Sequence, residues 1–234
     1  MEEHYDSMFK AHDRQREKRL RNGEYLAEII CSYVTPKTVV DVGCGLGFFL
    51  RAIQARGVAI TAIDADWVVP LTTEIDKSLY SYQDLNQPLD LSQRYDLAVS
   101  LEVAEHLKPE RGHSFVADLC ALSDMVLFSA AIPGQRGSGH IHMQWQDWWA
   151  ESFASHGYNC YDPVRRKIAA KPDAFDWFAQ NTLFFVKDGV DVPATLQEHR
   201  IEPQAAAYVG RGQYLRKQKF MRKRINKIKA EAAK

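Results

Sequence analysis

The segment from Val39 to Leu50 constrains the fold more than any other part of this chain. It reads VVDVGCGLGFFL: an apolar strand, a turn with three glycines, and the apolar start of a helix. A second apolar strand at residues 58–63 ends on Asp64. Glycines permit a tight turn and close approach of a ligand, and an acid after the second strand can hold two ribose hydroxyls. This arrangement predicts a nucleotide site at the carboxyl end of a parallel sheet.

The spacing of the glycines indicates the kind of nucleotide. Gly43, Gly45 and Gly47 follow Gly-x-Gly-x-Gly, whereas a dinucleotide turn would place its third glycine at Phe48. A phosphate-binding Walker loop would end in Gly-Lys-Ser/Thr, which the sequence lacks. Asp41 precedes the first glycine and would repel a phosphate, but it suits an ammonium or sulfonium group.

Length and composition favour one globular domain with terminal additions. The chain has 234 residues, of which 46% are hydrophobic, enough for a full α/β core. Four widely spaced cysteines without a C-x-x-C pair indicate reduced thiols. The sequence shows no signal peptide and no apolar run long enough to cross a bilayer, so we expect a cytoplasmic protein.

We divide the chain into three segments. Residues 1–36 are expected to form a helical extension, with a helix over 11–34 whose apolar stripe is Leu26, Ile29, Ile30 and Tyr33. Residues 37–187 are expected to form the alternating domain, and residues 188–234 a surface segment with a basic helix. Within the domain we expect strands at 38–42, 58–63, 79–82, 95–101, 124–130, 158–161 and 182–186, and helices at 46–56, 67–77, 109–122 and 145–156.

The charge is unevenly distributed. Residues 211–234 hold ten Lys and Arg and one acid, a charge of +9, and because the whole chain is neutral the rest carries −9. Such a segment predicts a partner of its own: an anionic surface, at the inner membrane face for example, or another protein. A solvated helix packed on the body or on a second copy of the chain is the alternative.

The glycine turn and its flanking acids resemble motif I of the class I S-adenosylmethionine (SAM) methyltransferases. That resemblance implies a Rossmann-like α/β fold with a mostly parallel seven-stranded sheet and helices on both faces. It implies SAM as cofactor, with Asp64 on the ribose and Asp84, after the third strand, on the adenine amino group. A plain Asx-turn is the alternative role of Asp84. The implied cofactor-binding residues are Asp41, Gly43, Gly45, Gly47, Asp64, Ala65, Asp84 and Leu85.

The fourth strand leads into an E-x-x-E-H pattern where this fold places the reacting methyl group. Glu102, Glu105 and His106 would share one face of a helical turn. They can bind a divalent ion, supply His106 as a general base, or form an inert ion pair. The pattern resembles the metal-binding segment of ubiquinone-pathway O-methyltransferases and small-RNA 2′-O-methyltransferases, which add a downstream histidine. His140 is the preferred partner over His142.

These residues give two overlapping sets. The catalytic set is Glu102, His106 and His140, and the metal set, for an ion such as Mg²⁺, is Glu102, Glu105, His106 and His140. The segments SLEVAEHL, AAIPGQ and QNTL, with Gly139-His140, resemble a bacterial group of methyltransferases associated with glycan assembly or specialised metabolites. That resemblance implies O-methylation of a sugar, glycan or small hydroxylated metabolite. RNA 2′-O-methylation and a non-catalytic SAM-binding subunit are the alternatives, and the acidic body argues against nucleic acid.

Overall fold

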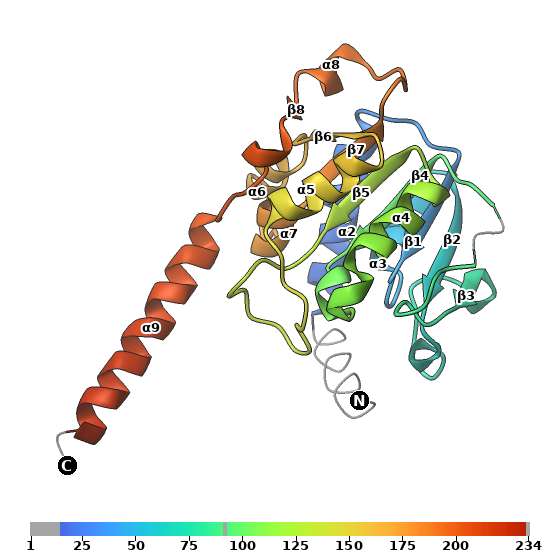
Figure 1. Cartoon of the computed structure of the whole chain (residues 1–234). Coiled ribbons are helices and arrows are strands. Elements are labelled where there is room, and N and C mark those ends of the chain that lie inside the picture. Colours follow the sequence, from blue (N-terminus) through green and yellow to red (C-terminus); the bar gives the residue numbers. More distant parts are fainter. Residues whose placement is uncertain (1–14, 91–92, 233–234) are drawn as a thin grey trace.

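The computed structural model describes residues 15–90 and 93–232. A mixed eight-stranded sheet forms its centre, in the order β3-β2-β1-β4-β5-β7-β6-β8 (Figure 1). The first five strands pair in parallel, and β7 runs antiparallel to both β5 and β6. The strands are β1 (Thr38–Val42), β2 (Ala59–Asp64), β3 (Tyr80–Tyr82), β4 (Leu97–Leu101), β5 (Met125–Ser129), β6 (Tyr158–Tyr161), β7 (Leu183–Lys187) and β8 (Arg200–Ile201).

The Rossmann-like fold is confirmed, but the expected number of seven strands was wrong. The eighth strand, β8, pairs antiparallel with β6 at the edge of the sheet. It is two residues long, Arg200 and Ile201, and so carries no alternation that a sequence pattern can detect.

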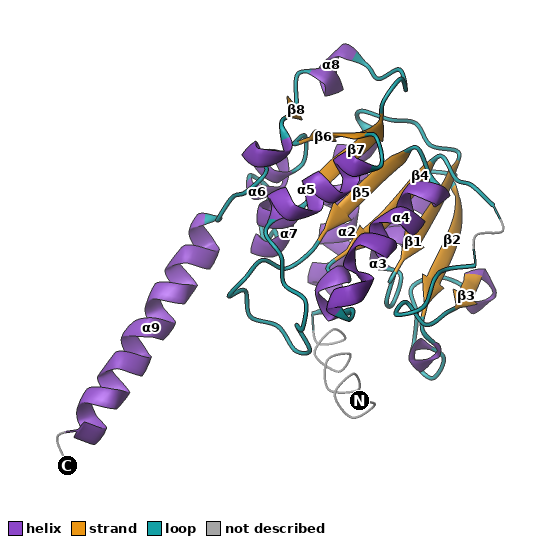
Figure 2. Ribbon diagram, viewed as in Figure 1, coloured by secondary structure: helices purple, strands orange, loops and turns teal. Residues whose placement is uncertain are grey.

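Helices cover both faces of the sheet (Figure 2). Side chains alternate along each strand, so that Val39 joins one core cluster and Val40 the other. The first cluster includes residues of α2, α3, α6 and α7, and the second includes residues of α4 and α5. The helices are α2 (Arg16–Cys31), α3 (Phe48–Gln54), α4 (Gly112–Leu122), α5 (Gln146–Ser155), α6 (Arg165–Ala169), α7 (Asp176–Asn181), α8 (Ala194–Gln197) and α9 (Arg211–Ala232).

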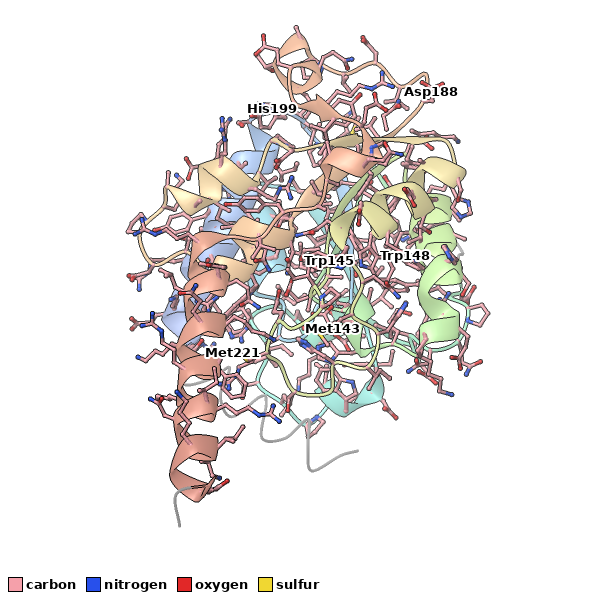
Figure 3. The ribbon with its side chains drawn as sticks, turned by 60° about the vertical axis from the view of Figure 1, so that its left-hand side comes forward. Met143, Trp145, Trp148, Asp188, His199 and Met221 are labelled. Atoms are coloured by element: carbon pink, nitrogen blue, oxygen red, sulfur yellow. The ribbon has the colours of Figure 1, made fainter. Side chains whose placement is uncertain are left out.

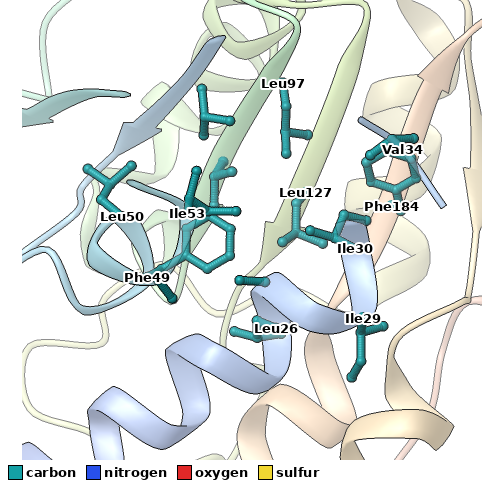
Figure 4. Close-up of a cluster of buried hydrophobic side chains, with 14 of the residues drawn as sticks. Leu26, Ile29, Ile30, Val34, Phe49, Leu50, Ile53, Leu97, Leu127 and Phe184 are labelled. Atoms are coloured by element: carbon teal, nitrogen blue, oxygen red, sulfur yellow. The ribbon is translucent and has the colours of Figure 1, made fainter. Parts of the chain in front are cut away.

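The expected N-terminal helix is present as α2, although residues 11–14 lie outside the described part. Its predicted stripe of Leu26, Ile29, Ile30 and Tyr33 is buried. Figure 4 shows Leu26, Ile29 and Ile30 of this stripe beside α3 and the strands, with Ile30 near Leu127. The N-terminal segment therefore shares one core with the alternating domain, and α2 covers the sheet next to the glycine turn.

Two regions differ from expectation. The helix expected at 67–77 is absent: a 3-10 turn, Asp66–Val68, is followed by irregular chain through Pro70. Pro70 lacks an N–H and the preceding valines are β-branched, which disfavours a helix there. Conversely, α6 and α7 were not expected, because each is too short to show a helical period. None of the helices in the described part of the chain combines the length and apolar composition needed to span a bilayer.

Candidate active site at the carboxyl edge of the sheet

The glycine turn after β1 uses a backbone conformation that favours glycine. Gly43, Gly45 and Gly47 have φ angles of 81°, 55° and 81°. The Gly43 N–H donates to the Ile63 carbonyl at 2.7 Å, which ties the turn to β2. A Cβ atom at position 43 would overlap the side chain of Val103, which follows β4. The turn is therefore packed between β2 and the segment after β4.

Asp64 ends β2 and holds the turn from the other side. Its Oδ2 accepts the Gly45 N–H at 2.6 Å, and its Oδ1 accepts the Ala65 N–H at 2.7 Å. Burial raises the pKa of this carboxyl to about 7, although the two hydrogen bonds oppose the rise. The predicted ribose-binding acid and the glycine turn thus form one hydrogen-bonded unit.

Asp41 is buried one residue before the end of β1. Its Oδ1 has no hydrogen-bond partner among the described residues. Burial, and then the charge of Asp64, raise its pKa well above the usual range. Asp41 and Gly43 line a partly open cavity of about 90 Å³, which is also lined by α2, by Phe175 and by Phe178 of α7. A buried acceptor without a donor, facing a cavity, indicates a place for a donor group of a ligand.

Arg19, on α2, lines the same cavity and was missed by the sequence reasoning. Its Nε is buried and has no hydrogen-bond partner among the described residues, and its guanidinium lies 5.6 Å from the Phe175 ring centroid. Burial lowers its pKa to about 10, so the side chain remains cationic at neutral pH. A signal was present in the sequence, because Arg19 precedes Leu26 by seven residues and so lies on the stripe that faces the sheet.

The predicted adenine contacts follow β3. Asp84 is exposed, and its Oδ1 accepts the Asn86 N–H at 2.9 Å, which forms the Asx-turn considered as its alternative role. Leu85 is buried, and its carbonyl accepts a hydrogen bond from Arg111 Nε at 3.1 Å. The adenine role of this pair stays a prediction.

Glu102 does not lie in a helical turn, so the expectation that it shares a helical face with Glu105 and His106 was wrong. Its φ angle is +59°, and the 3-10 turn Ala104–His106 begins after it. The Glu102 carboxylate accepts hydrogen bonds from Asn181 Nδ2 at 3.0 Å and Gln135 Nε2 at 2.9 Å. Burial raises its pKa, and these hydrogen bonds oppose the rise.

The amides around Glu102 form a network that the sequence reasoning did not assign. Gln135 Oε1 accepts hydrogen bonds from Gln180 Nε2 at 3.1 Å and from Asn181 Nδ2 at 3.0 Å. Gln180 and Asn181 are both buried at the end of α7. The sequence segments 100–107, 129–135 and 180–183, which carried the resemblance to a bacterial group, therefore meet at one carboxylate.

Glu105, His106 and His140 form a second cluster beside that network. One potential ligand atom from each lies within 4.8 Å of the others, and Glu102 is outside this group. Both carboxylate oxygens of Glu105 are buried without a hydrogen-bond partner among the described residues. His140 Nε2 lies 3.8 Å from Glu105 Oε1, and the His106 and His140 ring centroids are 4.9 Å apart. The groups that could bind a cation are thus gathered at one carboxylate, which lies close to the backbone N–H groups of Glu105 and Ala131 and to His140 but makes no hydrogen bond of normal geometry among the described residues.

Backbone contacts fix this cluster. The Glu105 carbonyl accepts the N–H groups of Ile141 at 2.9 Å and His142 at 3.0 Å. A Cβ atom at Gly137 would overlap the imidazole of His140, so the loop needs glycine there. Burial and the charge of Glu102 raise the pKa of Glu105 well above its usual range, and burial lowers the pKa of His140. The loop thus holds His140, whose imidazole burial keeps neutral, against a buried carboxyl.

A family model described as a methyltransferase domain matches residues 11–167, about two thirds of the chain. The chain belongs to this methyltransferase-domain family.

Curated relatives of the methyltransferase include the ubiquinone biosynthesis O-methyltransferases of Rickettsia canadensis and Rickettsia bellii. The first is 30% identical over 104 residues, 41% of this chain and 43% of that protein. The second is 29% identical over 92 residues, 36% of this chain and 38% of that protein. The match thus spans less than half the length of these curated relatives.

Two solved structures share the fold of the methyltransferase. Magnesium protoporphyrin IX methyltransferase from Synechocystis PCC 6803, with bound SAH, is 15% identical with a TM-score of 0.54, over 74% of this chain and 85% of that chain. Streptomyces venezuelae DesVI is 12% identical with a TM-score of 0.54, over 78% and 98%. Likeness at this identity confirms the architecture alone.

Some of the aromatic residues after the glycine loop of the methyltransferase pack in the core, and others lie beside His142. Trp149 and Phe153 on α5 are buried and pack against Phe128 of β5. Trp148 lies on the same helix (Figure 3). Its ring centroid is 5.6 Å from that of His142. His142 is therefore packed among tryptophans, and His140 is the histidine of this loop that reaches the Glu105 cluster.

Proposed function

We propose that this methyltransferase binds SAM at the glycine turn, with the amino acid end of SAM in the cavity between α2, β1 and the turn. The proposal rests on an acid and a guanidinium that line this cavity: Asp41 Oδ1 and Arg19 Nε are both buried and have no hydrogen-bond partner among the described residues. An amino acid moiety is a zwitterion, so Asp41 suits its ammonium and Arg19 its carboxylate. Asp64 is the proposed ribose contact, because its oxygens keep lone pairs beyond those that accept the Gly45 and Ala65 N–H groups, and Asp84 is the proposed adenine contact.

We infer that the Glu102–His140 end of the site binds the acceptor and removes its proton. Methyl transfer from a sulfonium is an in-line displacement, so the protein must align the acceptor, exclude water and deprotonate it. His106 or His140 takes the proton. The hydrogen bonds from Gln135 and Asn181 hold the Glu102 carboxylate in place, where it orients the acceptor hydroxyl.

The Glu105, His106 and His140 group fits a divalent metal ion, because its orphaned carboxylate and two imidazoles are metal donors. Two nitrogen donors suit Mn²⁺, Fe²⁺ or Zn²⁺ better than Mg²⁺, which prefers oxygen. Such an ion would supply Lewis acidity that lowers the pKa of an acceptor hydroxyl. The ligand set proposed here excludes Glu102, because of the described residues only Glu105, His106 and His140 bring ligand atoms within 4.8 Å of one another.

We propose a hydroxyl oxygen of a sugar, glycan or small hydroxylated metabolite as the methyl acceptor. The curated relatives are named O-methyltransferases, which supports oxygen as the methylated atom. RNA 2′-O-methylation is the second candidate, because residues 211–234 carry a charge of +9.

The metal proposal is tested by titrating the full chain with Mn²⁺ in a calorimeter. We expect Glu105→Gln to weaken Mn²⁺ binding by about 100-fold, since it removes the anionic ligand, and to leave SAM binding unchanged. Glu110→Gln, an exposed acid nearby, is the matched control. Equal Mn²⁺ affinity of wild type and Glu105→Gln would remove the metal from the proposal.

Turnover is then measured as S-adenosylhomocysteine release over a panel of hydroxylated acceptors. We expect His140→Ala to abolish release with SAM affinity retained. SAM binding without turnover on any sugar, phenol or RNA acceptor would instead favour the non-catalytic subunit.

A further inference from the structure

The basic helix α9 stands away from the rest of the protein. Figure 1 shows it leaving the body after β8 and the short segment that follows that strand. Residues 214–229 are all exposed. Contacts with the body lie in its first half: Arg216 pairs with Asp176, Gln213 Nε2 donates to the Gly134 carbonyl at 3.3 Å, and the Arg136 guanidinium lies 4.0 Å from the Phe220 ring centroid. The alternative of a helix packed along the body is therefore wrong for most of α9.

An apolar stripe runs along this free helix. Tyr214, Met221, Ile225 and Ile228 are 55%, 44%, 46% and 55% exposed. Their spacing of seven, four and three residues keeps them within about 60° of one another at about 100° per residue. Figure 3 places Met221 on the outer part of the molecule. Four adjacent apolar side chains on an isolated helix indicate that something covers them.

Cations border the stripe on both sides. On the same helical projection, Lys217 and Arg224 lie along one edge, and Arg222 and Lys229 along the other. The opposite face carries Lys219, Lys223 and Lys227. Long basic side chains beside an apolar stripe can extend toward anionic headgroups while their aliphatic stems and the stripe enter the acyl boundary.

We propose that α9 lies flat on an anionic lipid bilayer, with the Tyr214–Ile228 stripe facing the acyl chains. Nucleic acid satisfies the cations but offers no apolar surface to Met221, Ile225 and Ile228. Pairing with α9 of a second copy would bring two segments of charge +9 together. An anionic bilayer is the partner that matches both features. The stripe from Tyr214 to Ile228 is about 21 Å long at about 1.5 Å per residue.

Docking of α9 would also orient the body. Gln213 and Phe220 contact Gly134 and Arg136, which belong to the loop that leads to His140. The bilayer is therefore brought to the side of the molecule that carries this loop. This orientation is independent of which acceptor the site uses.

Vesicle flotation tests the proposal. We expect the full chain to float with vesicles of about one third phosphatidylglycerol in phosphatidylcholine and to stay unbound with pure phosphatidylcholine. About 0.5 M NaCl should weaken the binding by screening the charges. Ile225→Gln/Ile228→Gln should reduce the bound fraction about tenfold, because it removes the apolar contact but keeps the charge and helix propensity. Val69→Gln, an exposed valine on the body, should bind like the wild type.

Three results would overturn the proposal. The first is failure of the wild type to float with anionic vesicles. The second is equal flotation of the double variant, with far-ultraviolet circular dichroism showing unchanged helicity. The third is tight binding of transfer RNA by both the wild type and the double variant, together with weak binding of vesicles. That result would mean that α9 binds polyanions through its charge alone. Arg222→Gln/Lys229→Gln, which removes two cations along one edge of the stripe, measures the charge contribution and should lower the bound fraction.

Discussion

At the scale of single residues, the site keeps charged groups where burial disfavours them. Asp41 and Asp64 are buried at the ends of neighbouring strands, and each pKa is raised by loss of water. Arg19 is the nearby cation, with its pKa lowered by burial. Such groups destabilise the ligand-free protein, so we attribute their presence to a ligand that carries matching charges.

Asp64→Asn should change how stability depends on pH. The folded pKa of Asp64, about 7, lies above the 3.8 of a solvent-exposed aspartate. As pH rises, the unfolded chain therefore releases this proton at a lower pH than the folded protein does. The free energy of unfolding falls with pH between the two pKa values and stays at the lower level above the folded pKa. The variant lacks this titration, so its stability relative to wild type should rise by about 2 to 4 kcal/mol from pH 4.5 to pH 8.

Urea denaturation followed by tryptophan fluorescence at both pH values measures this difference. Asp66→Asn, an exposed acid two residues away, is the control. A wild-type-to-variant difference that stays constant with pH would contradict the buried, raised-pKa state of Asp64.

Arg19→Met should weaken SAM binding by about 30- to 100-fold, the value of one or two hydrogen bonds to a charged group. Methionine retains the aliphatic volume against Phe175 but cannot bind a carboxylate. Arg21→Met is the matched control, because Arg21 lies on the same helix and pairs with Asp173 at 3.9 Å. Calorimetry with SAM compares the three proteins, and equal affinity of Arg19→Met and wild type would exclude the carboxylate contact.

At the scale of elements, local sequence patterns predicted the strand–turn–helix unit but could not predict contacts between residues that are far apart in the sequence. The glycine spacing identified the β1–α3 turn because positive φ angles have a direct sequence signature. Glu102 also has a positive φ, but a glutamate carries no such signature. Asn181 reaches Glu102 across 79 positions of sequence, so only the folded sheet brings them together.

The glycine turn allows a paired test of close packing. Gly43 and Gly57 have similar φ angles, 81° and 79°, but a Cβ atom at Gly43 would overlap Val103 while Gly57 has nothing within 4 Å. Gly57→Ala should therefore cost only the backbone strain, about 1 kcal/mol of unfolding free energy. Gly43→Ala should cost about 2 to 4 kcal/mol, because the clash adds to that strain. Equal losses in urea denaturation would mean that the turn relaxes freely.

At the scale of the whole molecule, the sheet order and the two helical layers place every proposed contact at one edge. The parallel strands β1, β2 and β4 end beside one another, so Asp41, Asp64 and Glu102 converge although they are far apart in sequence. The sequence placed the nucleotide site at the carboxyl end of a parallel sheet, and the resemblance to methyltransferases implied that the fourth strand ends beside it. The sequence did not predict that α2 lines the cavity, because helix-to-sheet packing depends on the complete fold.

The central claim is that the cavity beside the glycine turn binds a zwitterionic methyl donor and not a phosphate. Isothermal calorimetry of the full chain with SAM, S-adenosylhomocysteine, NAD and ATP tests it most directly. We predict one site for SAM and S-adenosylhomocysteine with a Kd of about 1 to 100 μM, and no heat from NAD or ATP. Saturable binding of NAD or ATP, with none of SAM or S-adenosylhomocysteine, would contradict the claim.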